Sequence, residues 1–200
     1  MERESPRQRL LDDAIDYVAQ HGLADVSLRT LAAGIGTSHR MLIHHFGSRE
    51  RLWVEIVRTV EARQRGVLAQ IVPDAEIAVR DAMWAWWKHI SDPALWPNER
   101  LFFEIYGQAL QGRPHTMELL DGIVEDWLDP AAEINVSLGV PPELARAHAR
   151  LGVAVTRGLL LDLLATRDVA AVDAAMEAFI DVYTSWLELH GRPIATASRT

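Results

Sequence analysis

Apolar residues follow a helical spacing along almost the whole chain. Leu11, Ala14, Ile15 and Val18 are separated by steps of three, one and three residues, which places them on one side of an α-helix. Comparable spacing recurs as far as 169–190, and no segment alternates apolar and polar residues as a half-buried strand does. The pattern predicts an all-α protein.

Capping residues, glycines and prolines divide this pattern into separate helices. Serine and threonine side chains accept hydrogen bonds from the free N–H groups at helix starts, whereas glycine and proline favour helix ends. In the N-terminal quarter they predict four helices. The first ends at His21-Gly22, and the second runs from a Ser27 cap to Gly34 or Gly36. The third runs from a Thr37 or Ser38 cap to about His45, and the fourth spans 49–71. Further helices are expected over 74–90, 98–111, 115–128, 131–138, 141–166 and 169–190, before a disordered tail over 191–200.

The second and third expected helices are short and are joined by a tight turn that contains glycine. This arrangement is typical of a helix-turn-helix. On the third helix, Ser38, Met41, Leu42 and His45 share one side by their spacing, and we expect that side to pack inward.

Two pairs of residues on the third helix then project outward, His39 with Ile43 and Arg40 with His44. Outward residues of such a helix face either solvent or the major groove of DNA. In a groove, Arg40 can donate two parallel hydrogen bonds to guanine O6 and N7. Taken residue by residue, a solvated helix in a small packing module explains the same positions equally well.

Charge is distributed unevenly along the chain. The net charge is -8, yet residues 1–66 hold ten arginines against nine acids and residues 67–200 hold ten basic residues against nineteen acids. Between Ser27 and Arg51 there are four arginines, and Glu50 is the only acid. Because local cations are what meet phosphates, the acidic total does not exclude a DNA partner.

Other classes of protein find little support. The chain has no cysteine for a disulfide or a thiolate metal site, and the adjacent His44 and His45 cannot both point at one metal from one helix face. No phosphate-binding glycine loop, G-x-S-x-G or H-E-x-x-H motif occurs. The charged N-terminus and the lack of an eighteen-residue apolar run predict a cytoplasmic protein without a membrane segment. We therefore expect no enzyme, no cofactor and no metal.

The segment RLLDDAIDYVAQHGLADVSLRTLAAGIGTSHRMLIHHFGSRERLW, residues 9–53, resembles the N-terminal region of the tetracycline-repressor (TetR) family of bacterial regulators. The likeness includes the G-x-[ST]-x-x-x-L-x-x-H-F core and the basic-acidic pair Arg49-Glu50. It implies a three-helix helix-turn-helix DNA-binding domain over 1–50, joined by a long helix to an all-helical ligand-binding and dimerisation domain over 51–190. Carried over position by position, the DNA-contact candidates are Ser27, Arg29, Thr37, Ser38, His39, Arg40, Ile43, His44 and Arg49.

Two residues depart from the family pattern. Ile43 stands where the family usually has a tyrosine that touches the DNA backbone, and Arg40 stands where a small residue is common. Ile43 can instead meet a thymine methyl group. These departures bear on which operator is read.

Large aromatic residues concentrate between Trp84 and Trp127. Rings at helical spacing are more often core than binding site, but small-molecule sites between helices are also mostly apolar with a few polar groups. Candidate residues for such an effector site are Trp84, Trp87, His89, Phe103, Glu104, Tyr106, Met117 and Trp127.

We therefore expect a homodimeric regulator, most simply a repressor, that binds a pseudo-palindromic double-stranded operator and releases it when a small apolar or aromatic compound binds. For the dimer, candidate apolar rows are Leu151, Val155, Leu159 and Leu163, and Val172, Ala175, Phe179 and Val182. The alternative is a helical small-molecule-binding or interaction protein without DNA binding.

Overall fold

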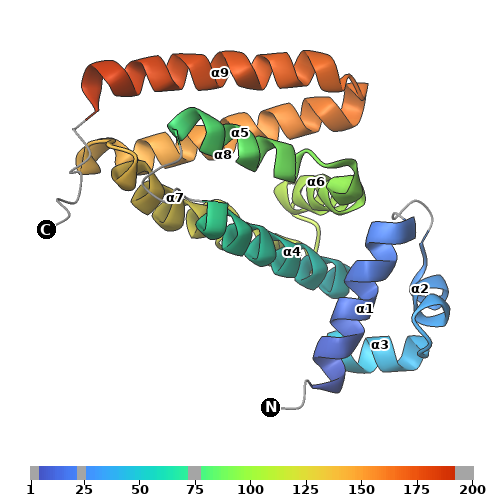
Figure 1. Cartoon of the computed structure of the whole chain (residues 1–200). Helices are drawn as coiled ribbons and strands as arrows, with labels where there is room; N and C mark the ends of the chain where they lie inside the picture. Colours follow the sequence, from blue (N-terminus) through green and yellow to red (C-terminus); the bar gives the residue numbers. More distant parts are fainter. Residues whose placement is uncertain (1–4, 22–25, 72–77, 192–200) are drawn as a thin grey trace, which may run out of the picture. The chain divides into compact units, whose positions relative to one another are not determined.

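The computed structural model describes residues 5–21, 26–71 and 78–191. Its helices are α1 Pro6–His21, α2 Leu28–Gly34, α3 His39–Phe46, α4 Arg49–Ile71, α5 Val79–Ile90, α6 Trp96–Leu110, α7 Glu125–Ser137, α8 Pro142–Thr166 and α9 Val169–His190 (Figure 1). Two short 3-10 turns, η1 Pro93–Leu95 and η2 Met117–Leu120, precede α6 and α7. The described residues contain no strand, so the expected all-α class is confirmed.

One expected pair of helices is wrong. Instead of a helix over 115–128 and a separate piece over 131–138, the structure has η2 and then α7, which continues through Pro130. Pro130 lies inside α7 and removes one backbone N–H from it, and packing of α7 along α8 accompanies the continuation of the helix through the proline. The start of the helix expected over 74–90, and the tail beyond residue 191, lie outside the described residues.

The helices group into two compact units. The first unit comprises Met1–Arg63 and Asp92–Ile123, and the second comprises Gln64–Ser91 and Val124–Thr200. The first unit thus takes in α6 as well as α1 to α3, and α4 contributes to both. The functional boundary expected at residue 50 remains a prediction.

The core of the first unit lies among α1, α2, α3 and the first turns of α4. The apolar row expected on α1 is buried, and α1 also packs against α6. The inner sides of the other three helices supply Leu31, Leu42, Phe46, Leu52 and Ile56, all of which are buried.

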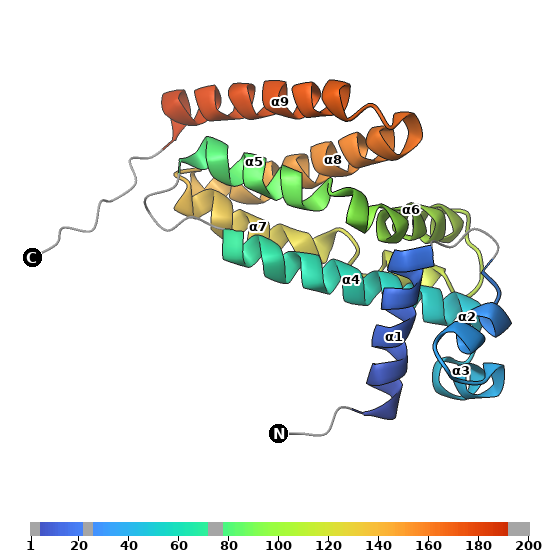
Figure 2. The same ribbon diagram turned by 45° about the vertical axis from the view of Figure 1, so that its right-hand side comes forward.

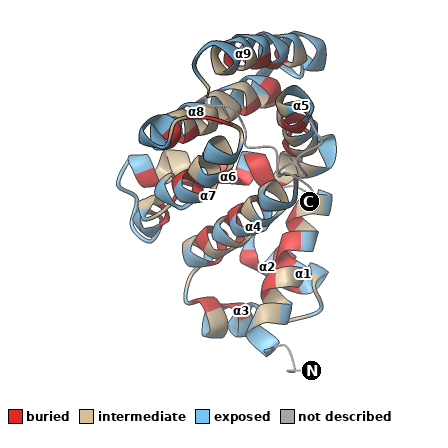
Figure 3. Ribbon diagram, turned by 60° about the vertical axis from the view of Figure 1, so that its left-hand side comes forward, coloured by how far each residue is buried: buried red, intermediate tan, exposed pale blue. Residues whose placement is uncertain are grey.

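In the second unit, α7 lies along α8, and α9 packs against both α5 and α8 (Figures 1 and 2). Trp87 on α5 is fully buried, and its Nε1 donates to Asp173 Oδ1 of α9 at 2.7 Å. Figure 3 shows exposed residues along much of α9. No helix in the described ranges is both long enough and apolar enough to cross a membrane.

Candidate nucleic-acid interface

Serine side chains fix the starts of α2 and α3. Ser27 Oγ accepts the backbone N–H of Thr30 at 3.1 Å, and Ser38 Oγ accepts that of Met41 at 3.2 Å. Between the two helices, Gly36 has a φ of +69°, a conformation that glycine adopts without steric penalty. The sequence alone therefore positions α3 after α2 through a cap and a turn.

A close contact between α1 and α2 depends on a second glycine. A Cβ atom on Gly34 would lie 2.1 Å from Cε2 of the Tyr17 ring, which is far inside van der Waals contact. The same ring stacks on His21 with centroids 4.2 Å apart. Gly34 thus permits the end of α2 to approach α1.

The inner side of α3 is held by burial and by one arginine. Leu42 and Phe46 are buried, and the Arg7 guanidinium lies 5.0 Å from the centre of the Phe46 ring. Arg7 also donates from Nε to the carbonyl oxygen of His45 at 3.4 Å and forms an ion pair with Glu55 of α4. These contacts fix which side of α3 remains available to a partner.

The outward side of α3 carries His39, Arg40, Ile43 and His44, all of them exposed as expected. The expectation that Met41 packs inward is wrong, since 41% of this residue is exposed. Ser38, placed on the same inward side, is also exposed, and His45 is only partly buried. The inward direction is set by Leu42 and Phe46, and successive helical residues are turned by about 100°, so Met41 falls outside it.

The remaining DNA-contact candidates belong to the same unit. Ser27 and Arg29 are exposed and Thr37 is partly buried. Arg49 is exposed at the start of α4, with its guanidinium 5.7 Å from the centre of the Trp53 ring. Within the described residues, neither Arg29 nor Arg40 forms an ion pair, and both are exposed.

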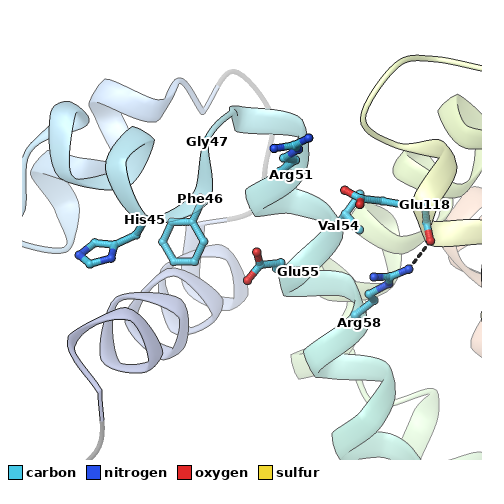
Figure 4. A pocket seen from close by; sticks show the side chains of 8 residues that line it. All are labelled: His45, Phe46, Gly47, Arg51, Val54, Glu55, Arg58 and Glu118. Atoms are coloured by element: carbon cyan, nitrogen blue, oxygen red, sulfur yellow. Dashed lines mark hydrogen bonds between the residues drawn. The ribbon is translucent and has the colours of Figure 1, made fainter.

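A hollow of about 350 Å³ lies beside the end of α3, and sequence reasoning did not identify it. Figure 4 shows the side chains that line it; they are His45, Phe46, Gly47, Arg51, Val54, Glu55, Arg58 and Glu118. Arg58 donates from Nη2 to the carbonyl oxygen of Glu118, which ties α4 to η2. The spacing of Arg51 and Arg58 by seven residues is the signal that could have placed them on one side of α4.

Residues 10–56 match the model of the family described as bacterial regulatory proteins, tetR family. Over 64 residues the chain is 33% identical to the HTH-type transcriptional repressor AcnR of Corynebacterium glutamicum, a match that covers 32% of this chain. Residues 10–56 therefore form a region similar to the N-terminal part of TetR-family regulators. The match spans 34% of the AcnR chain, so the chain aligns with about a third of the length of this curated relative.

Solved structures share the fold of this chain over most of its length. A transcriptional regulator from Rhodococcus sp. Rha1 has a TM-score of 0.71 at 20% identity, covering 91% of this chain and 97% of that one. A TetR-family regulator from Pectobacterium atrosepticum has a TM-score of 0.71 at 21% identity, covering 93% and 95%. At these identities the likeness shows the fold alone, including the N-terminal helix-turn-helix domain.

The effector-site candidates are divided between the two units. In the first unit, Phe103 contacts Phe102 edge to face at 5.0 Å, Tyr106 lies 5.4 Å from Phe102, and Met117 is 53% exposed. Glu104 is exposed there and accepts from Gln108.

In the second unit, the candidate tryptophans differ sharply in environment. Trp87 is a core residue tied to Asp173, whereas Trp84 is partly exposed with the Lys88 ammonium 5.6 Å from its ring. Both lie on α5, three residues apart, so their spacing alone does not separate them.

Three residues that sequence reasoning missed accompany His89 and Trp127 in the second unit. The Trp86 ring lies 5.8 Å from His89 and 5.9 Å from Trp127, and the Arg65 guanidinium lies 5.7 Å from the Trp127 ring. Gln64 is buried, with Oε1 2.7 Å from a ring nitrogen of His89. We call these five residues the aromatic cluster; it combines rings with a partly buried polar pair.

A second set of rings in the same unit contains a buried imidazole nitrogen. His148 of α8 lies 4.3 Å from Trp186 and 5.6 Å from Tyr183, and its Nδ1 has no hydrogen-bond partner within the described residues. Burial lowers the pKa of His148 and raises that of Tyr183 to about 12. The neutral form of His148 is therefore favoured in the folded unit.

Proposed function

We propose that this protein is a DNA-binding transcriptional repressor that reads base edges with the outward side of α3. The observation that carries this proposal is the fixed orientation of α3. Leu42 and Phe46 anchor one side of the helix, so the exposed Arg40 and His44 face away from the core. The family match over residues 10–56 supports the same assignment.

A mobility-shift titration with the upstream region of the protein's own gene tests this function. The wild type should bind one duplex more tightly than a shuffled duplex of equal length, and Arg40→Ala should reduce that preference. Arg113→Ala is the matched control, because it removes the same charge from an exposed position outside the helix-turn-helix. Equal binding to both duplexes by the wild type would favour a helical interaction protein without sequence-specific DNA binding.

The proposed repressor acts as a homodimer through the outer sides of α8 and α9. Of the apolar rows expected there, Leu163 and Val172 are buried within the unit, while Leu151 is 49% and Val182 71% exposed. Leu161, Val169 and Leu189 add further exposed apolar side chains to the two helices. A two-fold dimer presents two copies of α3, hence the expectation of a pseudo-palindromic operator.

Light scattering of a charged variant tests the dimer. Val182→Arg should yield a monomer at micromolar concentration, since an unpaired charge would be buried in the interface. Leu110→Arg is the control, because Leu110 is similarly exposed at 67% but lies on α6. A wild-type monomer would contradict the proposal.

We further propose that a small apolar or aromatic effector binds at the aromatic cluster and releases the operator. Planar apolar molecules stack on tryptophan rings, and the Gln64–His89 pair supplies polar groups for orientation. In a tryptophan-fluorescence screen, the compound should weaken operator binding, and operator should weaken compound binding by the same factor. Gln64→Leu should shift the compound's affinity, whereas Gln70→Leu, exposed on the same helix, should not.

A further inference from the structure

The exposed side of α3 has a polar middle and two apolar edges. With about 100° between successive residues, Arg40 and His44 point in nearly the same direction, opposite the buried Leu42 and Phe46. Met41 lies on one edge of that side and Ile43 on the other, about 160° apart around the helix axis. They are 41% and 36% exposed, so both keep apolar surface in contact with solvent.

The major groove of DNA contains one apolar group that such edges can meet. Each thymine carries a C5-methyl group at the side of its base pair, towards the wall of the groove, whereas the other groups on the base edges are hydrogen-bond donors and acceptors. A helix lying in the groove turns its middle to the base edges and its two edges towards the walls. A polar middle therefore suits a G·C pair, and apolar edges suit thymine methyl groups on opposite strands.

We propose that Met41 and Ile43 are specificity-determining residues that each cover a thymine methyl group, on opposite strands of the half-site, beside the guanine read by Arg40. This inference rests on the proposed DNA-binding function and states which bases the operator half-site holds. Met41 is the residue that the sequence had placed in the core, and its exposure is what makes the helix apolar on both edges.

Substitution of thymine by deoxyuridine tests this directly, because it removes the C5-methyl group and leaves every hydrogen-bonding group of the base unchanged. The bound duplex is first obtained by selection from random sequences with the wild-type protein. Each thymine of a half-site is then replaced singly and the dissociation constant is measured by fluorescence anisotropy. At two positions on opposite strands we expect affinity to fall about fourfold, corresponding to about 0.8 kcal/mol for one buried methyl group.

Variants assign each methyl group to its side chain. Met41→Ala should abolish the effect of deoxyuridine at one position and Ile43→Ala at the other, while each leaves the second position sensitive. Both residues are exposed, so the variants should keep the wild-type circular dichroism and unfolding temperature. Leu110→Ala is the matched control and should preserve sensitivity at both positions.

The possible outcomes separate this inference from the proposed function. If the wild type selects a duplex but no deoxyuridine substitution weakens binding, or if both positions stay sensitive in Met41→Ala and Ile43→Ala, the methyl contacts are refuted and the repressor function stands. Failure of the wild type to select any duplex overturns the proposed function, and this inference with it.

Discussion

The two units use polar side chains in opposite ways. Around α3 in the first unit, Arg29 and Arg40 are exposed and make no ion pair within the described residues. In the second unit, polar side chains accept hydrogen bonds from aromatic side chains inside the fold. Asp173 accepts from the Trp87 indole, and Asn135 accepts from the Tyr183 hydroxyl. Exposed arginines around α3 are thus the groups proposed to meet DNA, whereas the polar contacts of the second unit hold aromatic packing in place.

The largest expected effect concerns the core of the second unit. Trp87→Ala should lower the free energy of unfolding by about 3–5 kcal/mol, because a fully buried ring is removed and Asp173 loses its indole donor. Urea unfolding monitored by circular dichroism measures this. Trp84→Ala, at a partly exposed position on the same helix, should cost clearly less. Equal losses of unfolding free energy in the two variants would contradict the assignment of Trp87 to the core and of Trp84 to the surface.

The next largest loss of stability is expected from a substitution at the close contact between α1 and α2 in the first unit. Gly34→Ala should destabilise the protein by about 1–3 kcal/mol, since its Cβ would overlap the Tyr17 ring. Adding Tyr17→Ala should recover part of the stability that Gly34→Ala removes, in a double-mutant cycle followed by thermal unfolding. Gly66→Ala has nothing near its Cβ and should stabilise α4 by about 0.5–1 kcal/mol. A neutral Gly34→Ala would show that α1 and α2 are not in tight contact.

Two arginines of the first unit should contact different parts of the DNA, Arg40 a base and Arg49 a phosphate. Arg40→Ala should weaken operator binding by about 1–3 kcal/mol and relax the preference at one base pair per half-site. Arg49→Ala should weaken binding to all sequences about equally and reduce the salt dependence by about one unit for each phosphate that is no longer neutralised. Anisotropy titrations at several salt concentrations measure both. If the two variants change sequence preference and salt dependence in the same way, the assignment of Arg40 to a base and of Arg49 to a phosphate is wrong.

The smallest expected effect is a pH dependence in the second unit. Because burial lowers the pKa of His148 below its ordinary 6.5, the unfolded chain binds more protons than the folded one below that pH. This contribution to stability is complete above about pH 6.5 and is lost as the pH falls towards the folded pKa. Unfolding temperatures at pH 7.5 and 5.5 should therefore differ less in His148→Phe than in the wild type.

The control for that variant is His190→Phe, since His190 also stacks on Trp186 but is exposed. It should keep the wild-type pH dependence. If His148→Phe behaves in the same way as His190→Phe, the buried imidazole is not the group that titrates.

Much of the first unit was predictable because its elements are set by neighbours in sequence. Ser27 and Ser38 cap helices through N–H groups three residues away, and the apolar row of α1 is buried as expected. Met41 was misplaced for a physical reason. Residues grouped by the helical spacing can still point in directions about 100° apart, as Met41 and Leu42 do. The burial of Leu42 and Phe46 shows that the inward direction is theirs and not that of Met41.

The contacts of the second unit could not be predicted from local sequence, because they join residues that lie far apart along the chain. Trp87 is distinguished from Trp84 by Asp173, which lies 86 residues further along the chain. Trp86 joins the aromatic cluster through Trp127 of α7, a helix that continues through Pro130 and packs against α8. Tertiary packing overrode the local signals in both cases.

Dimethyl sulfate protection of the selected duplex tests the central claim most directly, because the reagent methylates guanine N7 in the major groove. The wild type should protect one guanine in each half-site, and Arg40→Ala should restore methylation of that guanine while other protections remain. The absence of a protected guanine, or protection that persists in Arg40→Ala, would contradict base reading by the outward side of α3.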